Sequence, residues 1–283
     1  MFAHQVIEDL KKEHTIRKDA ISTVISLIKC AHQVYIGDYW EMALLSGMKV
    51  GTPLLNKQRL QHMRMPYKCL WIDSLSSGSS KKGALVIDQD ETAGFRNVNS
   101  EDQYQVCAFH YFKDINRWRL NPCMASFNDK RTTFNHYSLP FTHRSLPEDV
   151  LQKAQDMLCD PLIMVITTIM LLNCKNISTE KIFAAPKLNK KRRKNWKQEL
   201  FDYHVLNVVV PSARREYRES TKPLSHNRVH LCRGHFKEYT SEHPLFGRLT
   251  GLYWWQPHVR GQNREGIVMK EYSLNKNKEF IAQ

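Results

Sequence analysis

Histidines and arginines gather near the end of this 283-residue chain in a combination that suits acid–base chemistry. Residues 226–262 hold five of the thirteen histidines and two Arg-Gly pairs. His235 and His258 could act as base and acid, while Arg233 and Arg260 could stabilise charge that develops on a phosphate. Imidazole suits such work because its pKa lies near neutrality. If these residues converge, they predict a metal-independent nuclease or phosphoryl-transfer site; if not, they decorate a basic surface.

The same segment also contains atoms that zinc accepts, in His226, His230, Cys232 and His235. The pattern around them is typical of a strand, in which alternate residues face opposite sides, so His235 would point away from His230 and Cys232. A structural zinc site also needs a second close pair of ligands, which the sequence lacks. We therefore predict neither a metal nor a cofactor.

A third chemistry is nucleic-acid binding, suggested by where the positive charge lies. The formal net charge is +14; from Lys181 onward the chain has 21 Lys and Arg against 9 Asp and Glu, a net +12. Aromatic residues beside these cations offer stacking planes for single strands or irregular RNA. The residues predicted to contact nucleic acid are Lys190, Lys191, Arg192, Arg193, Lys194, Trp196, Arg214, Arg215, Lys237, Arg248 and Trp254. The competing interpretation is solvated loop lysines and a Trp pair of which one ring fills the core.

The elements that must position these residues indicate an α+β fold. Apolar residues recur every three or four positions from about Lys18 to Val34, which predicts a helix in an N-terminal helical region spanning 1–67. From 68 to 283 short segments rich in branched and aromatic residues predict a mixed, mainly antiparallel sheet that includes strands after Tyr203. Three of these are predicted in "RVHLCRGHF", "TGLYWWQPHVRG" and "GIVMKEYSL". The basic stretch 186–198 has no apolar periodicity and is predicted to be an exposed loop. We expect one intertwined unit.

A helix beginning near Ser145, with an apolar continuation to about Asn173, is predicted to pack on the sheet. The apolar run Pro161–Leu172 has twelve residues, whereas spanning a bilayer takes about 20, so no membrane association is expected. Seven scattered cysteines and an N-terminus without an apolar leader core predict a reducing compartment, the cytoplasm. The oligomeric state stays open.

Part of the C-terminal segment resembles uncharacterised proteins encoded by bacteriophages and related mobile elements. The resemblance covers about the last fifty residues, and the positions that carry it are His230, Arg233, Gly234, His235, Phe236, Gly247, Trp255, Pro257, Arg260, Gly261, Lys270 and Tyr272. It implies no catalytic residues, only an origin: a non-structural phage protein in the host bacterial cytoplasm. With the charge, it leads us to expect binding to nucleic acid or another anionic host target, such as a protein or nucleotide, in counter-defence or regulation. The alternative is the His/Arg enzyme.

Overall fold

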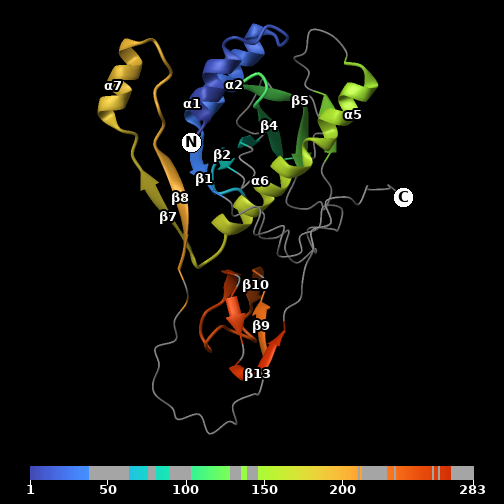
Figure 1. Cartoon of the computed structure of the whole chain (residues 1–283), viewed down its shortest axis with the longest axis vertical. Coiled ribbons are helices and arrows are strands. Elements are labelled where there is room, and N and C mark those ends of the chain that lie inside the picture. The colour runs from blue at the N-terminus through green and yellow to red at the C-terminus, as the bar shows by residue number, and fades with distance from the viewer. Residues whose placement is uncertain are drawn as a thin grey trace.

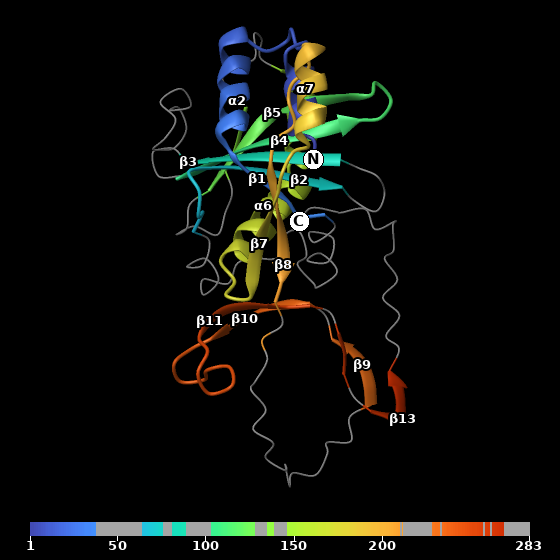
Figure 2. The same ribbon diagram turned by 90° about the vertical axis from the view of Figure 1, so that its left-hand side faces the viewer.

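The structure is a computed structural model of residues 1–283. It describes residues 1–37, 64–75, 81–88, 103–127, 146–209, 211 and 234–256, and the backbone alone of the strand residues 135–138, 228–232, 258–260 and 262–268. Within these residues, the helices and the large sheet lie towards one end and the last five strands towards the other (Figures 1 and 2).

One eight-stranded mixed sheet dominates the described residues, which confirms the predicted α+β class. In sheet order its strands are β6 (Asn135–Ser138), β5 (Arg117–Phe127), β4 (Tyr104–Phe112), β3 (Lys81–Asp88), β2 (Cys69–Leu75), β1 (His32–Tyr35), β8 (Tyr203–Val208) and β7 (Ile177–Ile182). Only β1 pairs in parallel, with β2 on one side and β8 on the other, and the remaining pairings are antiparallel. Among the described strands from Tyr203 onward, only β8 joins this sheet, so the expectation that the later strands β9 to β13 also join it is wrong.

Both faces of the central strands are covered by helices. Trp71, Leu85 and Phe109 belong to a core shared with the N-terminal helices α1 (Ala3–Leu10) and α2 (Lys18–Cys30). Leu70, Ala84 and their same-face neighbours belong to a second core with α6 (Cys159–Leu172). Because these strands are buried on both sides, they appear in the sequence as continuous apolar runs rather than as alternating patterns.

The N-terminal region differs from the expected helix over 18–34. The helix α2 ends at Cys30, and the next residues form β1 at the heart of the sheet. Val34 is fully buried there, because it lies between two parallel neighbours that the local sequence does not reveal. The preceding helix α1 is held against the sheet by Asp73 of β2, whose Oδ2 accepts a hydrogen bond from the Phe2 N–H at 2.7 Å.

The helix expected near Ser145 is confirmed as α5 (Glu148–Asp156), followed after Met157 and Leu158 by α6. Residues Glu148–Leu172 are long and apolar enough to cross a membrane by length and composition, yet 67% of an apolar 18-residue part of that stretch is buried inside the protein. Every α6 residue from Pro161 to Leu171 is buried against the sheet and its surroundings. We therefore assign α6 as the core helix of a soluble α+β domain.

Five short strands follow β8, in two small sheets. They are β9 (Arg228–Cys232), β10 (His235–Tyr239), β11 (Gly251–Trp255), β12 (His258–Arg260) and β13 (Gln262–Val268). β10 pairs with β11, while β9 lies between β12 and β13. The expected strands "RVHLCRGHF" and "TGLYWWQPHVRG" are therefore each divided in two, since β9 ends at Cys232 and β10 begins at His235, while β11 ends at Trp255 and β12 begins at His258. The same register continues across both breaks, since Cys232 pairs with His258 and His235 with Trp255.

Candidate nucleic-acid interface

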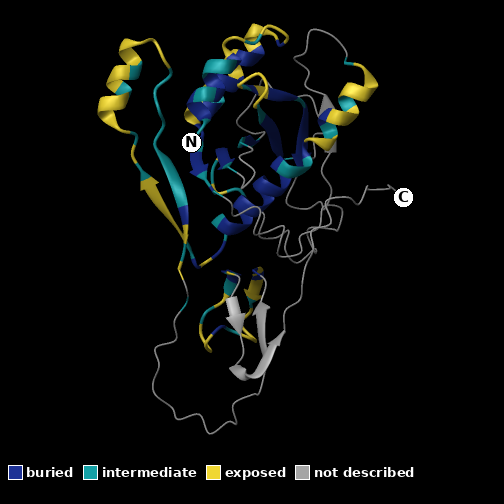
Figure 3. Ribbon diagram, in the orientation of Figure 1, coloured by how far each residue is buried: buried dark blue, intermediate teal, exposed yellow. Residues whose placement is uncertain are grey.

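The most basic segment of the chain forms a projecting helix, α7 (Pro186–Lys194). It connects β7 to β8, the antiparallel pair at one edge of the sheet, and stands apart from the core (Figure 1). No residue of α7 is buried, and the helix is largely exposed in Figure 3. The expected exposure of 186–198 is thus confirmed, whereas the expected loop is wrong.

Local chemistry explains why a helix forms without an apolar face. Pro186 occupies the first helical position, where its missing N–H costs nothing. Lysine and arginine are good helix formers, and Lys191, Arg192, Arg193 and Lys194 lie in the last turn, where cations interact favourably with the helix dipole. A periodic apolar pattern indicates a helix only when one face of that helix is buried. Because α7 has no buried residue, its sequence has no such pattern and was predicted to be a loop.

Polar side chains attach α7 to the body of the protein. Arg192 donates to Glu8 Oε1 of α1 at 2.8 Å and to the Gln198 carbonyl at 2.6 Å, and the Gln198 N–H donates to the same Glu8 oxygen. Asn189 exchanges two hydrogen bonds with the Leu200 backbone, at 2.8 and 3.0 Å. Arg192, predicted as a nucleic-acid contact, is therefore occupied in fixing the orientation of the helix.

Arg193 is similarly engaged, although in a more exposed position. Its guanidinium makes two hydrogen bonds to the Glu199 carboxylate, at 2.8 and 2.9 Å. This pairing lowers the pKa of Glu199 and raises that of Arg193. The predicted basic cluster therefore divides into two arginines with acidic partners and a set of lysines.

Four lysines form one stripe along α7. Lys187, Lys190, Lys191 and Lys194 are spaced three, four and seven residues from the first, which places them on one face of an α-helix. All four are exposed, and no described residue forms an ion pair with any of them. The stripe extends for about 10 Å at 1.5 Å per residue. We call these four residues the lysine stripe.

Trp196 ends this basic segment in an unusual conformation. Its side chain is 97% exposed, and its backbone φ of +54° lies in the left-handed region. Its N–H donates to the Arg193 carbonyl at 3.1 Å, and the N–H of Lys197 to the Arg192 carbonyl at 3.0 Å. These bonds terminate α7 through a position that glycine usually occupies. A large aromatic plane is thus displayed to solvent two residues after Lys194, the last lysine of the stripe.

The remaining predicted nucleic-acid contacts do not join this surface. Lys237 on β10 and Arg248 in the β10–β11 loop are exposed, but the β10–β11 pair lies towards the other end of the molecule from α7 (Figures 1 and 2). The Lys237 ammonium lies 4.7 Å from the ring centroid of Tyr239. Arg214 and Arg215 lie outside the described residues. Among the described residues, the predicted contacts therefore do not all lie on one surface.

Trp254 is a correction, because only 2% of it is exposed and its ring cannot stack on a base. It packs on Phe236, with ring centroids 4.5 Å apart, in the core that includes α6. The buried Asn176 side chain mimics a neighbouring strand: its Nδ2 donates to the Trp254 carbonyl at 2.8 Å, and its Oδ1 accepts from the Trp254 N–H at 2.9 Å. Trp254 anchors the β10–β11 pair to the protein.

The four proposed catalytic residues are only partly placed. His235 begins β10 with an exposed side chain, opposite Trp255. His258 and Arg260 belong to β12, where their backbones pair with Cys232 and His230. The side chains of β12 and all of Arg233 lie outside the described residues. Within the part of the chain that is described, no cluster of three or more His, Cys, Asp or Glu could hold a metal ion.

Buried titratable groups mark a second region that the sequence did not indicate. Burial, with the nearby Arg192 and the terminal amine, lowers the pKa of His4 in α1 to about 4. A cavity of about 340 Å³ lies beside it, where the end of β7 and the start of β8 meet α1. Lys187 and the cavity residues were absent from the predicted contacts. The spacing of the lysines could have indicated Lys187, whereas the cavity depends on packing between segments that are distant in the sequence.

Comparison of the chain with protein-family models, curated proteins and solved structures found no match. The functional argument therefore depends on the residues themselves.

Proposed function

We propose that the protein binds single-stranded nucleic acid through the lysine stripe and Trp196. The observation that carries the proposal is one face of a projecting helix with four lysines that have no acidic partner among the described residues, followed in the sequence by an almost fully exposed tryptophan. Lysines neutralise phosphates, and an exposed aromatic plane stacks on an unpaired base. Duplex DNA would use only the first of these interactions.

The attachments of α7 support this proposal because they hold the interface rigid. Glu8 and Glu199 neutralise the two arginines, and the bonds around Asn189 and Gln198 fix the loop that follows. The helix can therefore present its lysines without reorganising, which lowers the cost of binding.

Binding of a fluorescent single-stranded oligonucleotide, followed by anisotropy, tests the proposal. The variant Lys187→Gln, Lys190→Gln, Lys191→Gln, Lys194→Gln removes four charges from residues that contribute nothing to the core. A matched control removes four exposed charges elsewhere: Lys29→Gln, Lys113→Gln, Lys153→Gln, Lys175→Gln. We expect affinity at low salt to fall at least tenfold in the first variant and less than threefold in the control. Equal losses in both, or no binding by the unaltered protein, would contradict the proposal.

The origin of the protein remains a proposal that stands on the C-terminal resemblance alone. On that reading the nucleic acid is a phage or host strand in the bacterial cytoplasm, and binding serves counter-defence or regulation. No specific observation favours the alternative nuclease or phosphoryl-transfer function, since the described side chains include only His235 of its four residues.

A further inference from the structure

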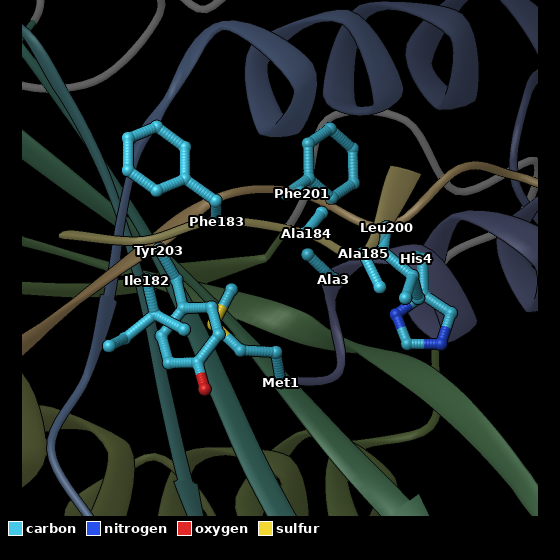
Figure 4. A pocket seen from close by; sticks show the side chains of 10 residues that line it. All are labelled: Met1, Ala3, His4, Ile182, Phe183, Ala184, Ala185, Leu200, Phe201 and Tyr203. Atoms are coloured by element: carbon cyan, nitrogen blue, oxygen red, sulfur yellow. The ribbon is translucent and has the colours of Figure 1, made fainter. Parts of the chain in front are cut away.

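A cavity opens at the base of α7, between the ends of β7 and β8 and the start of α1 (Figure 4). Its volume of about 340 Å³ is at the lower end of the range of about 300–1,000 Å³ found for small-molecule sites. That volume suits one planar base with its sugar. Ala184 and Ala185, which line it, directly precede the first helical residue of α7.

Aromatic rings and small side chains form the walls. In Figure 4 the rings of Phe183 and Phe201 lie on one side of the group and Tyr203 on the other, with alanines between them. Phe183 is 72% exposed, although phenylalanine side chains are usually buried. Rings arranged around a small, apolar space suit a flat aromatic ligand.

Two lining side chains carry polar atoms, the Tyr203 hydroxyl and the His4 imidazole. His4 is only 9% exposed, and no hydrogen bond from any described residue reaches its imidazole ring. Its ring nitrogens are not among the fully buried polar atoms without a partner, and His4 lines the cavity, so a ligand there can reach the ring. Because burial keeps the ring neutral at pH 7, it offers one donor and one acceptor, which match the edge of a nucleobase.

The cavity is held in shape before any ligand arrives. The Ala184 N–H donates to Asp202 Oδ1 at 2.9 Å, and Asp202 forms an ion pair with Lys181 at 3.1 Å. These contacts join the end of β7 to the start of β8. A preformed site loses little conformational freedom on binding.

The first turn of α7 lies beside this cavity and favours an anion. Ala185 provides no side-chain cap, so the first backbone N–H groups of the helix point outward with the positive end of its dipole. Lys187 and Lys190 of the lysine stripe follow within this turn and the next. A phosphate attached to a base in the cavity would meet both kinds of donor.

We propose that this cavity binds one unpaired nucleobase, with its 5′-phosphate at the N-terminus of α7. The proposal rests on the proposed function and deepens it: the lysine stripe holds the backbone of the strand, while the cavity receives a single base from it. Recognition of that base by His4 gives the protein a means of sequence preference that the stripe alone lacks.

Calorimetric titration of the whole protein with adenosine, uridine, cytidine and guanosine 5′-monophosphates tests the proposal, with ribose 5-phosphate as the comparison. At least one nucleotide is expected to bind ten times more tightly than ribose 5-phosphate, because only nucleotides fill the cavity. Equal affinity for ribose 5-phosphate and all four nucleotides would overturn the proposal, and this comparison needs no variant.

Two substitutions separate the cavity from the stripe. Ala184→Leu fills the cavity and is expected to weaken nucleotide binding at least tenfold, while the salt dependence of oligonucleotide binding is unchanged. His4→Leu is expected to weaken it about threefold to tenfold and His4→Gln less than twofold, as for the loss of one hydrogen bond. If the lysine-stripe variant loses oligonucleotide binding while folded Ala184→Leu binds nucleotide normally, the proposed function survives and the cavity proposal fails.

Discussion

Trp196→Gly is predicted to make the protein more stable and a poorer binder at the same time. An L-residue in the left-handed region costs about 1–2 kcal/mol, and glycine removes this strain. Glycine also gives the unfolded chain more conformational freedom, which lowers stability by about 0.5–1 kcal/mol and offsets part of the gain. The ring is 97% exposed, so its removal sacrifices no packing. The free energy of unfolding should therefore rise by about 0.5–1 kcal/mol.

In a chain of this size such a gain raises the melting temperature by roughly 1–4 °C. The same change removes the stacking plane, which is worth about 1–3 kcal/mol per base, so oligonucleotide affinity should fall roughly 5- to 150-fold. Calorimetric melting and anisotropy measure the two effects on one sample. Trp196→Phe is the matched control, because it keeps both an aromatic plane and the left-handed strain, and should change stability little and retain most of the affinity.

Either of two results would refute this reasoning. A lower melting temperature for Trp196→Gly would mean that the ring contributes to packing. Unchanged affinity would mean that no base stacks on it. An exposed tryptophan that costs stability is a local conflict in the sequence, and conflicts of this kind gather at functional sites.

Two further predictions concern the framework. Asn176→Asp leaves the buried Trp254 carbonyl without its donor and places a charge beside it, so urea denaturation should show a loss of at least about 2 kcal/mol, and unchanged stability would contradict the proposed anchor. Stability should also fall as the pH drops from 6.5 towards 4, because the unfolded chain binds more protons there. The loss is at most on the order of 2 kcal/mol at pH 5 for each histidine with a lowered pKa, and it is smaller where solvent screens the ring. Those histidines, each with a pKa of about 4 caused mainly by burial, are His4, His32 and His110. Burial raises the pKa of Asp73 to about 6, which acts in the opposite direction and offsets about 1 kcal/mol; a stability independent of pH between 7.5 and 5 would contradict this assignment.

The sequence predicts the parts of the fold whose burial is local. The run that forms α6 and the strands β2 to β5 are apolar enough to be recognised alone. β1 is different, because its four residues become central only through β2 and β8, which are distant in the chain. Likewise, strand alternation predicts that one of Trp254 and Trp255 is buried, but it does not show which one. The buried ring is that of Trp254, whose backbone is hydrogen-bonded to Asn176, 78 residues earlier.

The candidate interface could be predicted only in part from the sequence, for a related reason. Charge marks α7 as exposed, and the spacing of its lysines, tested as a helix, would have predicted the stripe. No pattern within 186–198 shows that Arg192 is held by Glu8, 184 residues away. The cavity combines α1 with the ends of β7 and β8, so it exists only in the folded chain.

The central claim, that the lysine stripe binds phosphates, is tested most directly by salt dependence. For single strands, the logarithm of the affinity falls with the logarithm of the salt concentration by about 0.7 for each phosphate neutralised. Affinity should be measured between 50 and 200 mM salt for the unaltered protein, the four-lysine variant and its charge-matched control. We predict that the slope becomes shallower by about 2–3 in the four-lysine variant and stays unchanged in the control. Equal slopes in all three proteins would contradict the account.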